Sequence, residues 1–213
     1  MKRIYVILLA ISGGFAQALS SQALSSQVMI RVNNGVGISS LKGRDGIFGD
    51  VITPYTFSLG ADYLNGRYWG LSSDVSFMGI GGMEKVWYAS DAGMLPGVET
   101  KVREKSNFVQ LNTTFRVKSS RTLQALYLGL GPSLSLRVSN GKFKRMLTGY
   151  DVARLLYGLK AEVGINGCLT GRWHAGINAG YIHNFNRFAR SLGGGDTFRS
   201  SVFTCTLMLG YAF

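Results

Sequence analysis

Few side chains in this sequence have the types and spacing needed for nucleophilic chemistry. The chain has two histidines, and hydrolysis by a serine needs a serine, a histidine and a carboxylate that converge. His183 and Ser201 form the candidate pair, because they fall on the same face of neighbouring predicted strands. No acidic residue is placed to orient His183. Metal-ligand spacings, phosphate-binding loops and heptad repeats are also absent from the sequence, which therefore predicts no catalytic site, no cofactor and no metal.

Charged residues are better candidates for a buried polar network. Seven of them fall on the polar face of alternating segments, opposite Leu, Val and aromatic residues. They are Asp62, Asp74, Arg116, Arg137, Arg154, Lys160 and Glu162. Enclosed charges need ion pairs or hydrogen bonds, so we expect these side chains to form a polar network in the lumen of a closed structure.

Eight segments with period-two alternation must position these residues. Each is about as long as a tilted membrane strand of about 9 to 11 residues. They cover residues 27–38, 55–63, a third segment that begins at 68, 108–118, 123–139, 153–166, 173–181 and 204–213. Pro132, inside the fifth segment, predicts a bulge. Short connections, one with an Asn65-Gly66 hairpin turn, alternate with long loops at 39–53, 81–106, 140–152 and 186–197.

The distribution of charge over the two faces distinguishes a membrane barrel from a soluble one. Eight strands enclose a narrow interior, which can hold paired charges but not the large apolar set of every strand. The apolar face is therefore the outer face, and a closed barrel satisfies its backbone groups in a bilayer. We expect an all-β, eight-stranded antiparallel up-and-down transmembrane barrel with short periplasmic turns and long extracellular loops. The soluble alternative is a lipocalin-like barrel with an apolar cavity.

The N-terminus predicts export. Lys2-Arg3, an apolar run at 4–11 and the small residues of Ala16-Gln17-Ala18 follow the order of a secretory signal peptide. We expect a signal peptide at 1–18, with cleavage possible as late as Ala23, a linker at 19–27 and a barrel domain at 28–213. Export permits a disulfide, but one cysteine falls at a turn and the other in mid-strand, so we expect none.

The mature chain is basic. Removal of Lys2 and Arg3 from the 23 basic side chains leaves 21 against 11 acidic ones, a net charge of +10. An exported basic protein favours anionic lipid or polysaccharide over nucleic acid. The predicted long loops hold Lys42, Arg44, Lys85, Lys101, Arg103, Lys105, Lys142, Lys144, Arg145, Arg187 and Arg190. The basic cluster Lys142, Lys144 and Arg145 suits phosphate contact at a membrane surface; solvated charges without a ligand are the alternative.

The sequence resembles small outer-membrane β-barrel families. The resemblance rests on the signal sequence, the eight alternating strands, the Asn65-Gly66 hairpin, the glycine-rich polar face and the terminal Leu209-Gly-Tyr-Ala-Phe213. It covers the whole mature chain and includes the OmpA-like transmembrane domain and the PorT-like porin family. It implies the outer membrane of a Gram-negative bacterium and a C-terminal assembly signal that the barrel insertion machinery reads. The residues that match this signal are Leu207, Leu209, Tyr211 and Phe213.

A fold alone does not define a function. We predict a structural or surface-interaction role without enzymatic activity, in which basic external loops contact lipopolysaccharide and offer a surface to a protein partner. One alternative is a small anion-preferring pore, because the predicted lumen cations outnumber the lumen acids and glycines reduce lumen bulk. Another is a component of a secretion system, as the PorT-like resemblance implies. A lipid A-modifying enzyme that uses His183 and Ser201 is the third.

Overall fold

The computed structural model describes residues 28–43, 50–63, 68–88, 98–119, 125–139, 150–191 and 197–213. The predicted signal peptide and linker, the Asn65-Gly66 turn and the basic cluster at 142–145 lie outside the described residues. Within the described ranges, no helix has the length and apolar character needed to cross a bilayer.

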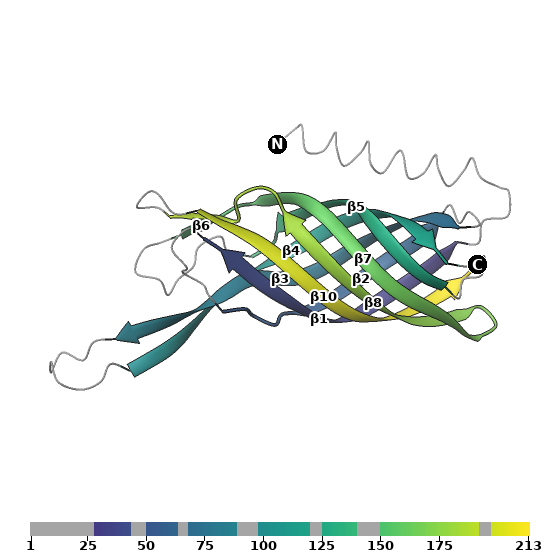
Figure 1. Cartoon of the computed structure of the whole chain (residues 1–213), viewed down its shortest axis with the longest axis horizontal. Coiled ribbons are helices and arrows are strands. Elements are labelled where there is room, and N and C mark those ends of the chain that lie inside the picture. The colour runs from purple at the N-terminus through teal and green to yellow at the C-terminus, as the bar shows by residue number, and fades with distance from the viewer. Residues whose placement is uncertain are drawn as a thin grey trace.

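Eight strands form a closed antiparallel ring (Figure 1). In ring order they are β1 (Met29–Lys42), β2 (Tyr55–Tyr63), β3 (Trp69–Tyr88), β4 (Val98–Lys118), β5 (Ala125–Arg137), β7 (Leu155–Thr170), β8 (Trp173–Asn184) and β10 (Thr197–Ala212). Pairing of β10 with β1, from Ala212↔Met29 to Arg199↔Lys42, closes the ring. Closure removes the free edges of the first and last strands. The predicted eight-stranded up-and-down barrel is confirmed.

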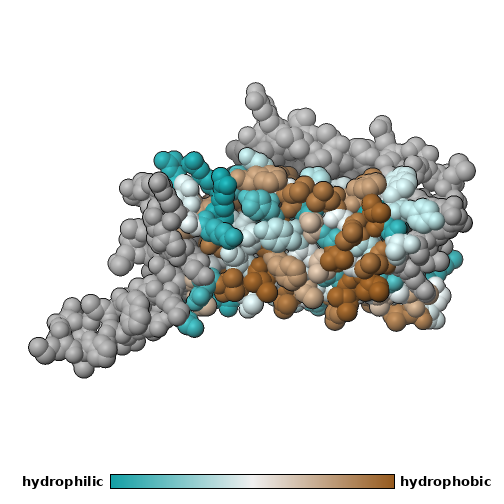
Figure 2. Space-filling model, viewed as in Figure 1, coloured by the Kyte–Doolittle hydropathy of each residue, from teal (hydrophilic) through white to brown (hydrophobic). Residues whose placement is uncertain are grey.

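The strands turn alternate side chains inward and outward. On β2, for example, Phe57 and Leu59 are exposed, whereas Ser58 and Asp62 are buried inside the ring. Figure 2 shows apolar side chains along the barrel wall and hydrophilic ones toward one end. Apolar side chains on the outside and charges on the inside are the arrangement that a bilayer stabilises, and the reverse of a soluble barrel.

Aromatic side chains mark both edges of the apolar wall. At the end near the C-terminus, Trp173 packs edge-on against Tyr211, and Tyr211 against Phe213, with ring centroids 5.1 Å apart in both pairs. At the other end, the His183 ring lies 5.7 Å from Phe185. The outward side of β8 from Trp173 to His183 spans about 25 Å, at about 3.3 Å per residue and a tilt of about 40°. This is the height of the apolar band of an outer-membrane barrel. We call the first end the inner end and the second the outer end.

Two of the predicted long loops contain short strands at the outer end. β6 (Tyr150–Val152) pairs with β9 (Ala189–Ser191), and β9 also pairs with β10 at Thr197 and Phe198. β6 and β9 are each three residues long, which is too short for a period-two pattern to be recognised in the sequence.

The predicted loop at 81–106 is largely a continuation of β3 and β4. The two strands stay paired as far as Tyr88↔Val98, and Figure 1 shows the resulting hairpin leaving the outline of the barrel. Basic residues occupy every second position from Lys101 to Lys105. Their polarity suggests a loop, but their spacing is equally that of a strand in water.

The predicted bulge at Pro132 is wrong. The β4–β5 register is the same on both sides of it, at Asn112↔Ser133 and at Phe115↔Leu130. Pro132 has no N–H to donate, and the ladder with β4 skips it and Gly131 without a shift in register. At Gly131 an added Cβ would overlap the backbone of Thr113, so glycine allows the two strands to approach closely beside the proline.

Candidate functional site

Three cations and three anions alternate in a closed ring inside the barrel. The contacts in order are Arg31 Nε to Asp62 Oδ1 at 3.0 Å, Asp62 Oδ1 to Arg116 Nη1 at 2.8 Å, Arg116 Nε to Glu162 Oε1 at 2.5 Å, Glu162 Oε2 to Lys160 Nζ at 3.3 Å, Lys160 Nζ to Asp74 Oδ2 at 2.7 Å and Asp74 Oδ2 to Arg31 Nη2 at 3.7 Å. Each side chain is at most 10% exposed. We call this set the ion ring.

Five strands position the ion ring. One member comes from each of β1, β2, β3 and β4, whereas Lys160 and Glu162 lie two residues apart on β7 and therefore point to the same side. Uncharged groups add hydrogen bonds: Arg31 donates to Ser72 at 2.5 Å, Asn112 donates to Asp74 at 2.8 Å and Thr114 donates to Glu162 at 2.9 Å. Buried charges require such partners, because an unpaired one destabilises the folded state strongly.

The ion ring brings together five of the seven predicted lumen residues. They are Asp62, Asp74, Arg116, Lys160 and Glu162. Arg31 is not among the predicted lumen residues, although alternation puts it on the polar face of its strand. A second signal is visible in the register: Arg31 lies opposite Gly60 and Gly210 on its two neighbouring strands, which leaves room for a long side chain.

The other two predicted lumen residues lie elsewhere, and the prediction is wrong for Arg154. Arg154 is exposed at the bend before β7, because the inward alternation begins only within the strand, at Leu156. Arg137 ends β5, is half-buried, and donates a hydrogen bond to the backbone carbonyl of Val152. The ion ring is therefore charge-balanced, and the cation excess on which the predicted anion preference rested is not found in it.

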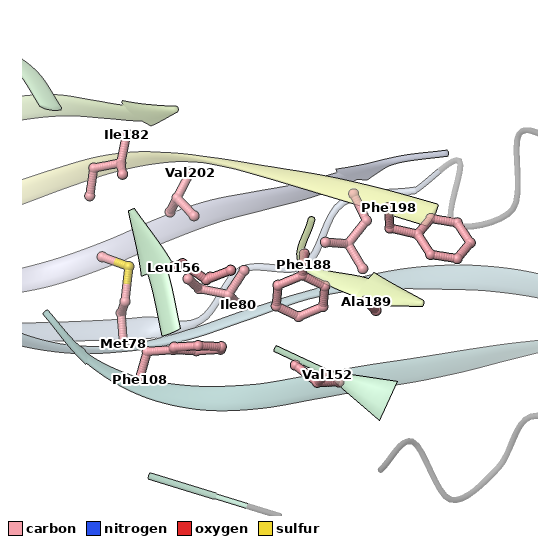
Figure 3. Packing of buried hydrophobic residues seen from close by; sticks show 11 residues of the cluster. Met78, Ile80, Phe108, Val152, Leu156, Ile182, Phe188, Ala189, Phe198 and Val202 are labelled. Carbon is pink, nitrogen blue, oxygen red and sulfur yellow. The ribbon is translucent and has the colours of Figure 1, made fainter. Parts of the chain in front are cut away.

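Apolar side chains fill the outer half of the interior, which the sequence analysis did not predict. They are Leu41, Met78, Ile80, Phe108, Val152, Leu156, Ile182, Phe188, Ala189, Phe198 and Val202. Figure 3 shows Phe188 and Ala189 from the β9 region packed among side chains of the barrel strands. The rings of Phe108 and Phe188 lie 6.0 Å apart. We call this set the apolar plug.

A small cavity separates the two sets. Its lining includes Arg31 and Asp74 from the ion ring and Met78 and Ile182 from the apolar plug. Its volume of about 20 Å³ suffices for on the order of one water molecule. The side-chain oxygens of Asn33 and Asn112, which also line it, have no hydrogen-bond partner in the protein, so a water bound there would satisfy them.

Tyr127 packs against the ion ring on the side of the inner end. Its ring lies 4.3 Å from the Arg116 guanidinium carbon, a cation–π contact, and its hydroxyl accepts a hydrogen bond from Asn178 at 2.6 Å. The ring rests directly on Gly164, where an added Cβ would overlap the phenol. At this lumen position glycine serves to seat a large side chain, whereas the pore alternative needs glycines to open a path.

Replacing Gly164 by alanine is expected to lower the free energy of unfolding by about 1–3 kcal/mol, because overpacking must displace Tyr127 from Arg116. Urea unfolding of the barrel in lipid vesicles would measure the change. Gly167→Ala is the matched control on the same strand, since its new Cβ would contact only Ala175, at 3.9 Å. Equal unfolding midpoints for the two variants would contradict the role assigned to Gly164.

The candidate nucleophilic pair lies at the outer aromatic edge. His183 and Ser201 are direct cross-strand partners, and both are half-buried. His183 packs between Tyr181 and Phe185. The residues paired with them on the next strands, Leu159 and Ser40, bring no carboxylate. Within the described ranges, no group of three or more His, Cys, Asp and Glu side chains could hold a metal ion.

Exposed cations surround the outer end. They are Lys42, Lys101, Arg103, Lys105, Arg154, Arg187, Arg190 and Arg199. Fewer acidic side chains are described there: Asp151 is exposed, Asp50 is half-buried and Glu104 is buried. The predicted cluster Lys142, Lys144 and Arg145 lies outside the described residues. The described surface of the outer end is therefore strongly positive.

Closed strands, an apolar wall between two aromatic edges and a charged interior define an eight-stranded outer-membrane β-barrel. No protein-family model and no curated protein matches the sequence.

Solved structures with this fold are similar to the chain. Ail, the attachment invasion locus protein of Yersinia pestis, in complex with the heparin analogue sucrose octasulfate, has a TM-score of 0.51 at 15% identity and covers 89% of this chain and 100% of its own. Neisserial surface protein A has a TM-score of 0.49 at 10% identity, over 87% of this chain and 97% of its own. The outer membrane protein AlkL has a TM-score of 0.49 at 13% identity, over 91% and 93%.

Proposed function

We propose that this barrel has a structural or surface-interaction role, in which its basic outer end binds the phosphate groups of lipopolysaccharide. The observation that carries the proposal is the excess of exposed Lys and Arg over acidic side chains around that end. Guanidinium and ammonium groups form charge-assisted hydrogen bonds with phosphate oxygens. The ion ring and the apolar plug support a rigid scaffold that presents this surface.

One similar structure offers a parallel in chemistry. The Ail structure contains a heparin analogue, sucrose octasulfate, which is a sulfated sugar and therefore anionic like phosphorylated lipopolysaccharide. The proposal includes a protein partner at the outer end and recognition of Phe213 by the assembly machinery. It also includes membership of the OmpA-like or PorT-like group, which the sequence resembles. Secretion-system membership is the alternative that this resemblance favours.

Refolded mature protein in detergent is expected to bind purified lipopolysaccharide, and the affinity is expected to fall as salt is raised. Exposed charges are screened beyond about 10 Å at about 0.1 M salt, so a phosphate-dependent contact must be salt-sensitive. Native mass spectrometry would count the bound lipid. The control is the same lipopolysaccharide after enzymatic dephosphorylation. Equal binding of both preparations would refute the proposal.

A further inference from the structure

The outward face of β4 changes from apolar to basic where the strand leaves the bilayer. Within the wall its outward positions carry Val109, Leu111 and Phe115, and Asn107 follows toward the outer end. The next three outward positions are Lys105, Arg103 and Lys101, all exposed. The alternating positions Ser106 and Glu104 are buried on the opposite face. The three cations therefore lie on the same strand face as the lipid-facing residues of the wall, farther toward the outer end.

The base of the hairpin is held in place. Asp50 forms an antiparallel bridge with Met83 on β3, through backbone hydrogen bonds of 3.0 and 3.2 Å. Arg103 donates a hydrogen bond to the backbone carbonyl of Thr53 at 3.4 Å. These contacts fix which side of the hairpin faces outward at the level where the cations begin.

The direction of the hairpin decides what its outward face can reach. Figure 1 shows β3 and β4 leaning away from the barrel beyond its outer end. A hairpin that leans away from the barrel turns its outward face toward the membrane surface. Alternate residues on a strand are about 7 Å apart, so Lys105, Arg103 and Lys101 form a row that begins at the edge of the apolar wall.

We propose that this row is a docking site for the phosphorylated headgroups of outer-leaflet lipid, with Lys105 closest to the bilayer and Lys101 farthest. The inference rests on the proposed function and narrows it from the whole outer end to one strand face and one source of phosphate. Charge complementarity supports it, as does continuity with the lipid-facing wall. A soluble anionic glycan has no acyl chains that would contact the apolar wall, so continuity with that wall favours membrane lipid as the occupant.

The test compares variants of the full mature chain. Lys101→Ser, Arg103→Ser and Lys105→Ser together remove the row at exposed positions. A cation near an anionic membrane surface contributes roughly fivefold in affinity, so the triple variant is expected to bind lipopolysaccharide in bilayer nanodiscs at least about tenfold more weakly. The charge-preserving triple Lys101→Arg, Arg103→Lys and Lys105→Arg is expected to keep the affinity within about threefold. Arg172→Ser, an exposed cation at the inner end, is expected to change nothing.

Two further arms separate the possible failures. Arg187→Ser, Arg190→Ser and Arg199→Ser remove as many cations elsewhere on the outer end; a loss equal to or larger than that of the hairpin variant would overturn the hairpin site while the proposed function stands. The soluble phosphorylated core oligosaccharide tests the source. If the hairpin variant loses affinity for it as strongly as for the bilayer form, the occupant is not membrane lipid. If the unaltered protein itself does not distinguish phosphorylated from dephosphorylated lipopolysaccharide, the proposed function falls first.

Discussion

Replacing Arg116 by methionine is expected to lower the free energy of unfolding by about 3–5 kcal/mol, because it leaves three buried carboxylates with two cations. Arg116 contacts Asp62 at 2.8 Å and Glu162 at 2.5 Å, and all three are almost fully buried. Lys160 would still contact Glu162, and Arg31 would still contact Asp62. The expected loss of unfolding free energy therefore comes from one unbalanced charge in the ion ring, and the barrel should still assemble.

Urea unfolding of refolded barrels in lipid vesicles would measure the Arg116→Met effect. Arg154→Met is the control, because Arg154 is exposed and surface substitutions usually change stability by less than about 0.5 kcal/mol. A second variant separates charge from packing. Adding Glu162→Gln to Arg116→Met removes the one excess negative charge, restores two cations and two anions in the ion ring, and should recover part of the stability. A double variant less stable than Arg116→Met would contradict the charge explanation.

Replacing Phe213 by aspartate is expected to lower the amount of folded barrel in the outer membrane of cells severalfold. Phe213 is exposed at the inner aromatic edge and packs only against its neighbour Tyr211 among the described ring contacts. The resemblance to outer-membrane families assigns the terminal aromatic to recognition by the insertion machinery. Loss of that recognition should reduce assembly in cells while refolding in detergent micelles, which needs no machinery, changes little.

The matched control for the terminal residue is Leu169→Asp. Leu169 is equally exposed, at 63% against 64% for Phe213, and also lies at the inner end of a strand, but it is not part of the C-terminal alternation. Immunodetection of heat-modifiable barrel in outer-membrane fractions would compare the two. Undiminished insertion of Phe213→Asp, or an equal defect in Leu169→Asp, would argue against a terminal assembly signal.

The alternation of side chains was sufficient to predict the barrel and much of its interior. The eight alternating segments predicted the closed barrel, and the charges on their polar faces predicted five members of the ion ring, because a strand has a strict period of two. Arg154 was misplaced because a residue just outside a strand keeps the sequence pattern but not the geometry. The hairpin was missed because Lys101 and Lys105 look like loop residues, although they alternate.

The apolar plug escaped prediction for a different reason. Near the outer end both faces of several strands are apolar, as Leu155 and Leu156 on β7 show. A rule that assigns one face of each strand to lipid and the other to a polar lumen cannot predict apolar side chains that face the lumen. Segments outside the ring complete this set: Phe188 is buried among strand residues far from it in sequence, and such a contact leaves no periodic signal.

The ion ring also bears on the order in which the barrel can be completed. Its six charged groups come from β1, β2, β3, β4 and β7, and none comes from β10. The charges can therefore pair with one another before β10 joins β1. When β10 then pairs with β1, it carries no ion ring charge into the interior, and the seam closes through backbone pairing. If the insertion machinery recognises the C-terminal residues as the resemblance implies, it can bind and release β10 last without disturbing the ion ring.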